Sequence, residues 1–179
     1  MCIRDSNTLL KTNSGNVFVG TDNAYNTYEW GQGLAKFDGT SNTGWTIYNI
    51  DNSDLPSNSV YSLLESSNGD IFVGAKGGGL AKFDGTSNTG WTIYNTDNSD
   101  LPHNYVYSLL ESSNGDIFVG TWEGLAKFDG TGNTGWTIYN TDNSDLPHND
   151  VYSLLESSNG NIFVGTFGGG LAKFDLSLI

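Results

Sequence analysis

One stretch of sequence recurs along the chain, and this repeat restricts the possible folds more than any other feature. The stretch VYSLLESSNGDIFVG spans residues 60–74, recurs unchanged at 106–120, and recurs at 151–165 with one Asp-to-Asn change. A more divergent copy, LLKTNSGNVFVG, covers residues 9–20. The turn glycines of the four copies are 54, 46 and 45 residues apart, at Gly15, Gly69, Gly115 and Gly160. A period in the mid-forties indicates a protein built from repeated supersecondary units.

Each unit is long enough for four short strands. In the second unit these strands are expected at residues 60–66, 70–75, 80–84 and 91–95. Asn68-Gly69, between the first two, indicates a two-residue hairpin with a type I′ turn, in which both central residues need φ > 0. Ile71-Phe72-Val73 is continuously apolar, as is typical of a strand covered on both faces. Four antiparallel strands in about 45 residues predict the blade of a β-propeller.

A four-stranded sheet with two apolar faces must be covered by neighbouring sheets. We therefore expect the phenylalanines of the second strands to be buried between blades, at Phe72, Phe118 and Phe163. The tryptophans that begin the fourth strands are expected at the outer edge, at Trp45, Trp91 and Trp136. Helical repeats of similar period are not expected, because Asn-Gly and Gly-Gly pairs interrupt any apolar stripe of helical period.

The predicted fold class is all-β, an arc of about four four-stranded antiparallel β-propeller blades that is a fragment of a larger ring. The blades are expected at residues 7–59, 60–105, 106–150 and 151–179. The first carries a loop insertion at 21–33, and the last ends after its third strand. Residues 1–6, MCIRDS, match no other copy and are expected to be foreign to the repeat.

The charge of the chain excludes several classes of partner. The formal net charge is −13, from 7 Lys and Arg against 20 Asp and Glu. Such a surface repels phosphate backbones and anionic lipids, so neither nucleic acid nor a membrane surface is expected as a partner. Cys2 is the only cysteine, which excludes an intrachain disulfide and a thiolate metal cluster. No apolar run reaches the length of a membrane span.

The near-identical copies differ mainly in one loop, between the second and third strands. The second unit has AKGGG at residues 75–79, the third has TWEG at 121–124, and the fourth has TFGGG at 166–170. Strand order puts this loop at the same end of the blade as the segment that precedes the first strand. The SSNG hairpin and the GTSNTG loop lie at the other end and barely vary. A constant frame with differing loops at one end favours a binding surface, and unrestrained drift of exposed loops is the alternative.

The candidate ligand-binding residues are the aromatic, charged and histidine side chains of this end. They are Tyr25, Tyr28, Trp30, Lys76, His103, Tyr105, Trp122, Glu123, His148 and Phe167. Exposed aromatic rings beside polar groups are suited to stacking on sugar rings or apolar ligands. For any single aromatic residue, packing against a neighbouring blade is the alternative.

Metal and cofactor signals are weak. His103 and His148 occupy equivalent positions one blade apart, but Ser57 takes this position in the preceding copy and no third ligand follows at a fixed spacing. The repeated DNSD could hold Ca²⁺, yet it lacks the alternating ligands and closing glutamate of a calcium-binding loop. Asp and Asn also form turns through bonds to their own backbone, and this interpretation is favoured. We expect no metal and no cofactor.

Several motifs together resemble a known repeat. In LPSNSVYSLLESSNGDIFVGAKGGGLAKFD they are the LPxNxV opening, the polar-Asn-Gly turn, the aromatic-Val-Gly strand end, and Gly-Gly-Leu before a strand ending in Phe-Asp. This pattern resembles the two-component regulator propeller repeat, with phenylalanine where that family often has tryptophan. The resemblance implies a ring of about seven blades. It also implies the periplasmic sensor portion of a hybrid histidine kinase, or a secreted or surface protein.

The resulting functional hypothesis is a non-catalytic sensor module located in the periplasm or outside the cell. It is expected to bind a small molecule or carbohydrate at the loop face. The remaining blades of the same ring are expected as a further partner. A structural or adhesive surface protein is the first alternative. A propeller enzyme such as a lyase is the second, although no serine elbow, paired carboxylates or phosphate loop is visible.

Overall fold

The computed structural model describes residues 6–22, 32–40, 43–85 and 88–174, and all regular secondary structure there is β. The strands are β1 (Ser6–Lys11), β2 (Val17–Thr21), β3 (Leu34–Phe37), β4 (Trp45–Tyr48), β5 (Val60–Glu65), β6 (Ile71–Ala75), β7 (Gly79–Phe83), β8 (Trp91–Tyr94), β9 (Val106–Glu111), β10 (Ile117–Thr121), β11 (Gly124–Phe128), β12 (Trp136–Tyr139), β13 (Val151–Glu156), β14 (Ile162–Thr166) and β15 (Gly170–Phe174).

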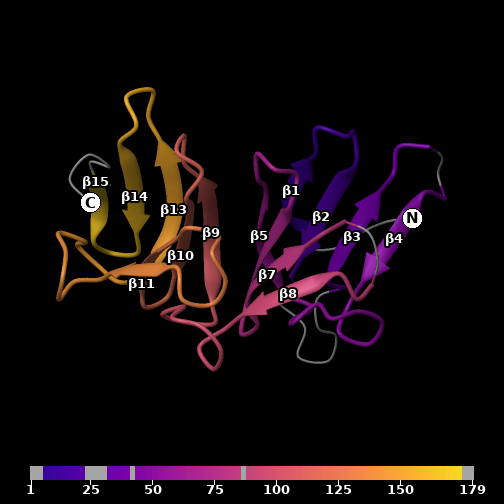
Figure 1. Ribbon diagram of the computed structural model, residues 1–179, viewed down its shortest axis with the longest axis horizontal. Coiled ribbons are helices and arrows are strands. Elements are labelled where there is room, and N and C mark those ends of the chain that lie inside the picture. The colour runs from indigo at the N-terminus through magenta and orange to yellow at the C-terminus, as the bar shows by residue number, and fades with distance from the viewer. Residues whose placement is uncertain (1–5, 23–31, 41–42, 86–87, 175–179) are drawn as a thin grey trace.

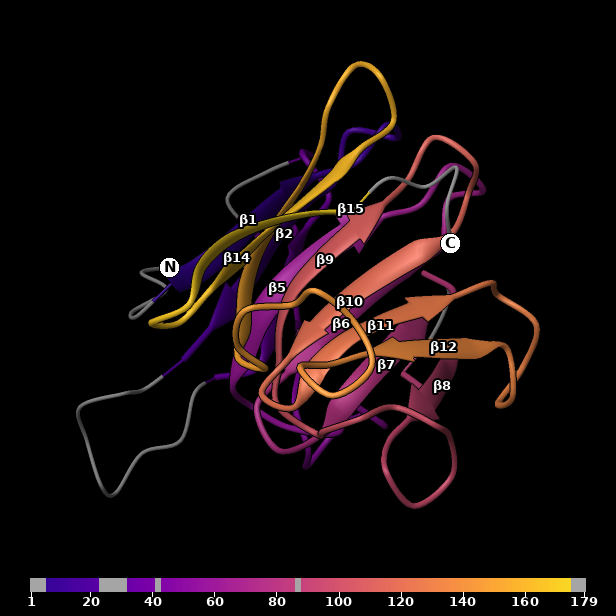
Figure 2. The ribbon, with the colours of Figure 1, turned by 90° about the vertical axis from the view of Figure 1, so that its left-hand side faces the viewer.

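These strands form four antiparallel sheets in which neighbours in sequence are neighbours in space. We name them blade 1 (β1–β4), blade 2 (β5–β8), blade 3 (β9–β12) and blade 4 (β13–β15). The first strands of successive blades lie next to each other, β1 beside β5, β5 beside β9, and β9 beside β13. The sheets stand as an open arc with blades 1 and 4 at its two ends (Figure 1). Viewed from the side of blade 4, they lie one behind another (Figure 2). The prediction of an all-β propeller arc is confirmed.

The hairpin between the first two strands of a blade differs from the expected one. The N–H of Gly69 donates to the carbonyl of Ser66 at 2.8 Å, and the N–H of Ser66 donates to the carbonyl of Asp70 at 2.9 Å. The loop therefore has three residues, Ser67, Asn68 and Gly69, with Gly69 at φ 88°. The type I′ prediction is wrong, because Asn-Gly also suits a longer loop with a left-handed glycine at its end.

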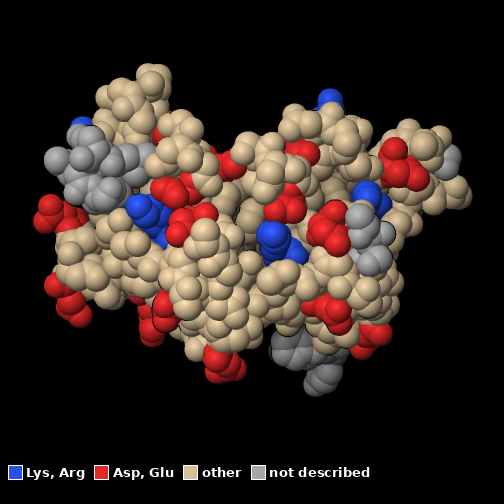
Figure 3. Space-filling view, viewed as in Figure 1, with Lys and Arg blue, Asp and Glu red and all other residues tan. Residues whose placement is uncertain are grey.

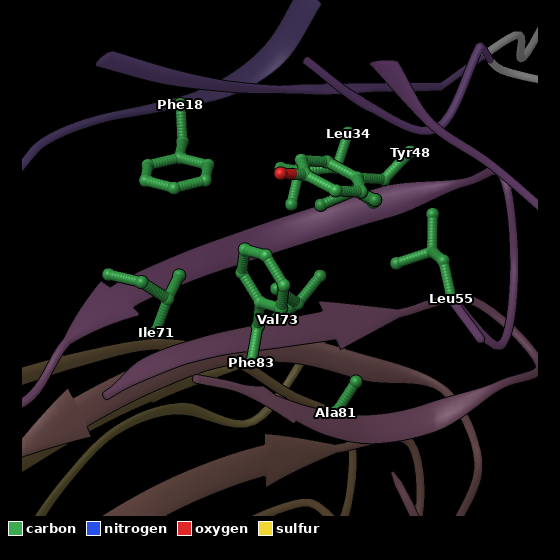
Figure 4. Packing of buried hydrophobic residues seen from close by; sticks show 9 residues of the cluster. Phe18, Leu34, Tyr48, Leu55, Ile71, Val73, Ala81 and Phe83 are labelled. Carbon is green, nitrogen blue, oxygen red and sulfur yellow. The ribbon is translucent and has the colours of Figure 1, made fainter. Parts of the chain in front are cut away.

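Apolar side chains from facing sheets fill the seam between each pair of blades. In the first seam, Phe18, Leu34 and Tyr48 of blade 1 face Val73 and Phe83 of blade 2 (Figure 4). Equivalent clusters fill the other two seams. The leucines of the SDLP segments are buried there as well, at Leu55, Leu101 and Leu146. Because an inner blade is covered on both faces, its second strand needs no polar alternation.

A glycine in the second strand makes room for a valine of the next blade. A Cβ atom added to Gly74 would lie 2.6 Å from Cγ1 of Val106, far inside van der Waals contact. Val106 begins the first strand of blade 3 and is fully buried. Gly20 and Gly120 approach Val60 and Val151 in the same way, at 2.5 and 2.6 Å. Each seam therefore depends on a glycine seat that admits one branched side chain.

The predicted burial of the second-strand phenylalanines holds for two of the three. Phe72 and Phe118 are buried in seams, with 4% and 0% of their surface exposed. Phe163 is only half-buried, which corrects the prediction. Its side of blade 4 faces away from blade 3, and Leu171 on the same side is 68% exposed. Burial at this position is therefore conferred by the following blade.

The outer strands carry the tryptophans as expected. Trp45, Trp91 and Trp136 begin β4, β8 and β12. Trp91 stacks on Phe83 with ring centroids 4.3 Å apart, which closes the outer end of the first seam.

On the face shown in Figure 3, Lys and Arg side chains are separated from each other by acidic ones. Within the described residues no helix is long and apolar enough to cross a membrane.

The difference between Phe118 and Phe163 provides a test of the seams. Phe118→Ala is expected to lower the free energy of unfolding by about 3–5 kcal/mol, because it leaves a cavity in a closed seam. The matched change Phe163→Ala removes the same side chain from a half-exposed position and is expected to cost clearly less. Urea denaturation followed by tryptophan fluorescence measures both. Equal losses for the two variants would contradict this account.

Candidate functional site

The structure places the variable loops beside the segments that precede the first strands. The N–H of Lys76 donates to the carbonyl of Ser59 at 2.9 Å, and the N–H of Trp122 donates to the carbonyl of Tyr105 at 3.2 Å. Phe167 makes the same bond to Asp150 at 3.0 Å. We call this side of the arc the loop end. The strand-order argument for bringing the variable loops together at one end is therefore correct.

A row of three neighbouring tyrosines crosses the inner strands near the loop end. The rings of Tyr61 and Tyr107 have centroids 5.6 Å apart, and those of Tyr107 and Tyr152 are 4.5 Å apart and nearly parallel, at 9°. Each tyrosine lies between the buried valine that begins its strand and a paired serine, at a shift in register typical of a β-bulge, and such a bulge interrupts the alternation of side chains and redirects the extra one. The first strands of neighbouring blades lie side by side, which makes the three rings neighbours. We call these three residues the tyrosine row.

The tyrosine row lines a hollow. The hollow has a volume of about 430 Å³, and its walls are Asn7, Tyr61, Lys76, Tyr107, Trp122 and Tyr152. Asn7 is the β1 counterpart of the tyrosines. Two loop residues singled out from the sequence, Lys76 and Trp122, thus share one hollow with four strand residues that were not, the three tyrosines and Asn7. This size and lining suit a ring-shaped ligand held by aromatic faces and a few polar groups.

Lys76 supplies the positive charge of the hollow. Its Nζ atom lies 5.8 Å from the centroid of the Tyr61 ring, within the range of a cation–π contact. A hydrogen bond with the Tyr61 side chain raises the pKa of Lys76 above its ordinary value, and the negative charge of Asp22 acts in the same direction. Burial raises the pKa of Tyr61 and of Tyr107. At neutral pH the ammonium group is therefore charged and both phenols are neutral.

Trp122 belongs to a second aromatic group that adjoins the row. Its ring lies 5.5 Å from Tyr105 and 6.0 Å from His103, and those two rings are 4.9 Å apart at 90°. Trp122 is 46% exposed, so part of its face remains open to a ligand. Glu123 follows it in the short turn between β10 and β11 and is exposed. Glu123 is not among the residues that line the hollow.

Blade 4 extends the aromatic surface. The ring of Phe167 lies 5.9 Å from Tyr152 and 6.5 Å from His148. Phe167 is 64% exposed. Seven of the ten candidate residues thus lie at the loop end. Six of them contact the tyrosine row or one another, and Glu123 lies beside Trp122 in the chain. The other three, Tyr25, Tyr28 and Trp30, lie outside the described residues.

The two histidines act as backbone acceptors in turns. Nδ1 of His103 accepts a hydrogen bond from the N–H of Tyr105 at 2.9 Å, and Nδ1 of His148 accepts one from the N–H of Asp150 at 3.1 Å. Oγ of Ser57 accepts the equivalent bond from Ser59 at 3.2 Å. Serine and histidine can replace each other at this position because both offer an acceptor to the N–H two residues later.

The DNSD segments are turns held by their own side chains. Oδ1 of Asn98 accepts the N–H of Asn95 at 2.9 Å, and Nδ2 of Asn98 donates to the carbonyl of Ile93 at 2.9 Å. Oγ of Ser99 donates to the carbonyl of Asn95 at 2.8 Å. The same bonds recur around Asn52 and Asn143. The turn interpretation of this repeated segment accounts for its Asn and Ser residues.

Sequence reasoning missed the tyrosine row because it searched for differences between copies. Tyr61, Tyr107 and Tyr152 occupy the same position in every full copy, so comparing the copies does not single them out. The recurrence itself was a signal nevertheless, because neighbouring first strands bring residues at equivalent positions side by side.

The fold and this site define a β-propeller repeat protein with an aromatic surface at one end of its arc. Three segments, residues 54–77, 100–123 and 145–168, match the family model described as two component regulator propeller. The three matches confirm the resemblance seen in the sequence, in three of the four repeats. Each matched segment includes one tyrosine of the row and at least the first two residues of the loop that follows the second strand.

Solved structures with the same fold include extracellular and surface proteins. The chain is similar to a protein from B. thetaiotaomicron described as the extracellular domain of the hybrid two component system BT4673, with a TM-score of 0.77 and 16% identity over 97% of this chain and 24% of that one. It is also similar to PorZ, a surface component of the type-IX secretion system of Porphyromonas gingivalis (TM-score 0.73, 17% identity, 95% of this chain, 26% of that one).

A third similar structure is the virginiamycin B lyase of Staphylococcus aureus, with a TM-score of 0.62 and 16% identity over 93% of this chain and 54% of that one. No curated protein matches the chain by sequence. The chain spans about a quarter of the length of the first two structures. At these identities the likeness shows the fold alone.

The raised pKa of Tyr107 predicts a loss of stability at alkaline pH. The ordinary pKa of tyrosine is 10.0, and burial raises that of Tyr107 in the folded chain. Above pH 10 the unfolded chain loses this proton while the folded chain keeps it, so the contribution is complete below pH 10 and is lost as pH rises toward the folded pKa. The free energy of unfolding, measured by urea denaturation from about pH 9 to about 11, is expected to fall. The decline should be smaller in Tyr107→Phe, and an unchanged decline would contradict the assignment.

Proposed function

We propose that the chain is the non-catalytic ligand-binding part of a sensor propeller located in the periplasm or outside the cell. Its ligand is a small molecule or an oligosaccharide with a ring that stacks on the aromatic surface of the loop end. The observation that carries the proposal is the tyrosine row lining a hollow of about 430 Å³ together with Lys76 and Trp122. The family match and the extracellular or surface location of two similar structures support the sensor setting.

The chemistry of the hollow suits rings with polar edges. Tyr107 and Tyr152 stack on each other and form a fixed aromatic wall of the hollow, and Trp122, which is 46% exposed, adds a partly open aromatic face. Sugar rings pack on an open aromatic face through their apolar C–H side, and flat heterocyclic rings stack on it, while their hydroxyl or acidic groups need partners at the edge. The Lys76 ammonium and the Asn7 amide are those partners here. Of the two, Lys76 adds a preference for ligands with negative charge.

The described lining favours binding over catalysis. Acid–base catalysis works best with groups that titrate near the working pH. The pKa values of Lys76, Tyr61 and Tyr107 are all raised, which moves these three groups further from neutrality. The proposal therefore assigns recognition to the hollow and no bond-breaking step. It also requires no metal and no cofactor.

Trp122 is the residue whose loss best tests the proposal. Trp122→Ala is expected to weaken binding of the best ligand from an oligosaccharide panel by about 1–3 kcal/mol, a loss of roughly 5- to 150-fold in affinity. Its exposed side chain lies outside the seams, so the melting temperature should change little. Isothermal titration calorimetry measures the affinity.

The matched control lies at the other end of the same blade. Asn133→Ala changes an exposed residue in the loop between β11 and β12 and is expected to leave the affinity unchanged. Binding that survives Trp122→Ala combined with Tyr107→Ala, but is lost in Asn133→Ala, would place the site at the opposite end and overturn the proposal.

A further inference from the structure

Three Asn-Gly pairs occur in the chain, each in the hairpin between the first two strands of a blade, at Asn68, Asn114 and Asn159. In such a pair the backbone nitrogen of the glycine can attack the asparagine side chain, because glycine has no Cβ atom to hinder the approach. The local sequences are nearly identical, SSNGD in blades 2 and 3 and SSNGN in blade 4. All three asparagines are exposed, so water reaches each of them.

Deamidation of an Asn-Gly pair needs no reagent other than water. The glycine nitrogen loses its proton to solvent and forms a bond to the Cγ atom of the asparagine. The side-chain amide nitrogen takes up a proton and leaves as ammonia, so that a five-membered succinimide ring remains. Water then opens the ring at one of its two carbonyl groups, which gives aspartate or isoaspartate. Water is consumed, ammonia is released and nothing is oxidised or reduced.

In blade 2, an aspartate two residues later holds the asparagine side chain in place. Oδ1 of Asn68 accepts the hydroxyl of Ser66 at 2.6 Å and the N–H of Asp70 at 3.1 Å. Nδ2 of Asn68 donates to a carboxylate oxygen of Asp70 at 3.1 Å. The ammonium group of Lys82 lies 3.2 Å from that same oxygen. The Asn68 side chain therefore has to break three hydrogen bonds before its Cγ atom can meet the glycine nitrogen.

Blade 3 repeats this arrangement. Nδ2 of Asn114 donates to the carboxylate of Asp116 at 3.0 Å, and its Oδ1 accepts the N–H of Asp116 at 3.3 Å. Oδ1 also accepts the hydroxyl of Ser112. In both inner blades a carboxylate thus binds the nitrogen atom that deamidation would release.

Blade 4 has Asn161 in place of this aspartate. Oδ1 of Asn159 accepts the hydroxyl of Ser157 at 2.6 Å and Nδ2 of Asn161 at 3.0 Å. Within the described residues Asn159 makes these two side-chain hydrogen bonds, where Asn68 makes three, and neither involves its Nδ2 atom. The leaving nitrogen of Asn159 is therefore not held as those of the other two asparagines are.

The charge at this position acts in the same direction. A carboxylate beside the hairpin opposes both the loss of the glycine proton and the formation of a second carboxylate. Deamidation of Asn68 would replace its hydrogen bond to Asp70 with a contact between like charges. At position 159 an aspartate fits, because the side chain there only accepts hydrogen bonds and Asn161 can donate to a carboxylate oxygen as well as to an amide oxygen.

We propose that Asn159 is the preferred site at which this chain deamidates, and that Asp70 and Asp116 protect the equivalent asparagines of blades 2 and 3. The reaction adds one negative charge to the blade 4 hairpin and, in the isoaspartate form, one more atom to its backbone. The hairpin is at the opposite end of the arc from the aromatic surface, so the proposal does not depend on ligand binding.

Peptide mapping of the folded chain tests the proposal. Trypsin cuts after lysine and leaves each Asn-Gly pair on a peptide of its own, residues 37–76, 83–127 and 128–173. During incubation at neutral pH, mass spectrometry is expected to show Asn159 converting about 2- to 10-fold faster than Asn68 or Asn114, the factor that corresponds to one hydrogen bond. In urea, where the hairpins are absent, the three rates should be alike. Equal rates in the folded chain would overturn the proposal.

Two reciprocal variants test the role of the carboxylate. Asn161→Asp supplies the missing carboxylate in blade 4 and should slow the conversion of Asn159 to the rate of the other two sites. Asp70→Asn removes the carboxylate from blade 2 and should raise the rate at Asn68 to that of Asn159 in the unchanged chain. Circular dichroism checks that both variants keep their fold.

Lys82→Gln is the matched control for Asp70→Asn. It removes the same ion pair but keeps the carboxylate that binds Nδ2 of Asn68, so deamidation of Asn68 should stay slow. The proposal is overturned if Lys82→Gln accelerates this reaction as much as Asp70→Asn does. It is also overturned if Asp70→Asn leaves the rate at Asn68 unchanged, or if Asn161→Asp leaves the rate at Asn159 unchanged.

Discussion

The structure depends on the burial of both faces of each blade by its neighbours. A sheet with apolar side chains on two sides has no stable existence alone in water, and each seam here closes only because a glycine admits the valine of the next blade. The close approach of Gly74 and Val106 sets how far apart two first strands can lie. At the other end of the strand, the Glu111 carboxylate accepts hydrogen bonds from the N–H and the hydroxyl of Ser67 in the preceding blade, which fixes the register of the two blades. Stability and repeat geometry therefore come from one interface used three times.

The candidate site follows from this interface. The first strands of neighbouring blades lie side by side, so residues at equivalent positions of these strands can contact each other. One tyrosine per repeat thus becomes a row of neighbouring rings. The three tyrosine rings, which every full copy contributes, line the hollow together. The loops after the second strands add residues that differ from blade to blade, with Lys76, Trp122 and Phe167 at equivalent places. Recognition can thus change through these loops without disturbing the seams.

The sequence was informative where a property is local or periodic. Strand number, order and the shared end of the variable loops followed from the copies, because alternation and turn residues act over a few positions. Three features depended on more than this. The hairpin length follows from the hydrogen bonds of Ser66, the exposure of Phe163 follows from the position of its blade in the arc, and the tyrosine row follows from contacts between copies. A search for differences between copies cannot single out a residue that every full copy has.

The positions that break the repeat are informative for the same reason. Residue 57 is serine, whereas the equivalent residues 103 and 148 are histidines, and all three side chains accept a backbone N–H. The exchange of serine for histidine therefore preserves the turn and alters only the side chain presented at the loop end. By contrast, Lys11 stands where the other first strands have glutamate, and a lysine ammonium cannot accept the backbone N–H that those carboxylates bind. A substitution that keeps the acceptor therefore alters only the surface, whereas one that removes the acceptor removes the contact.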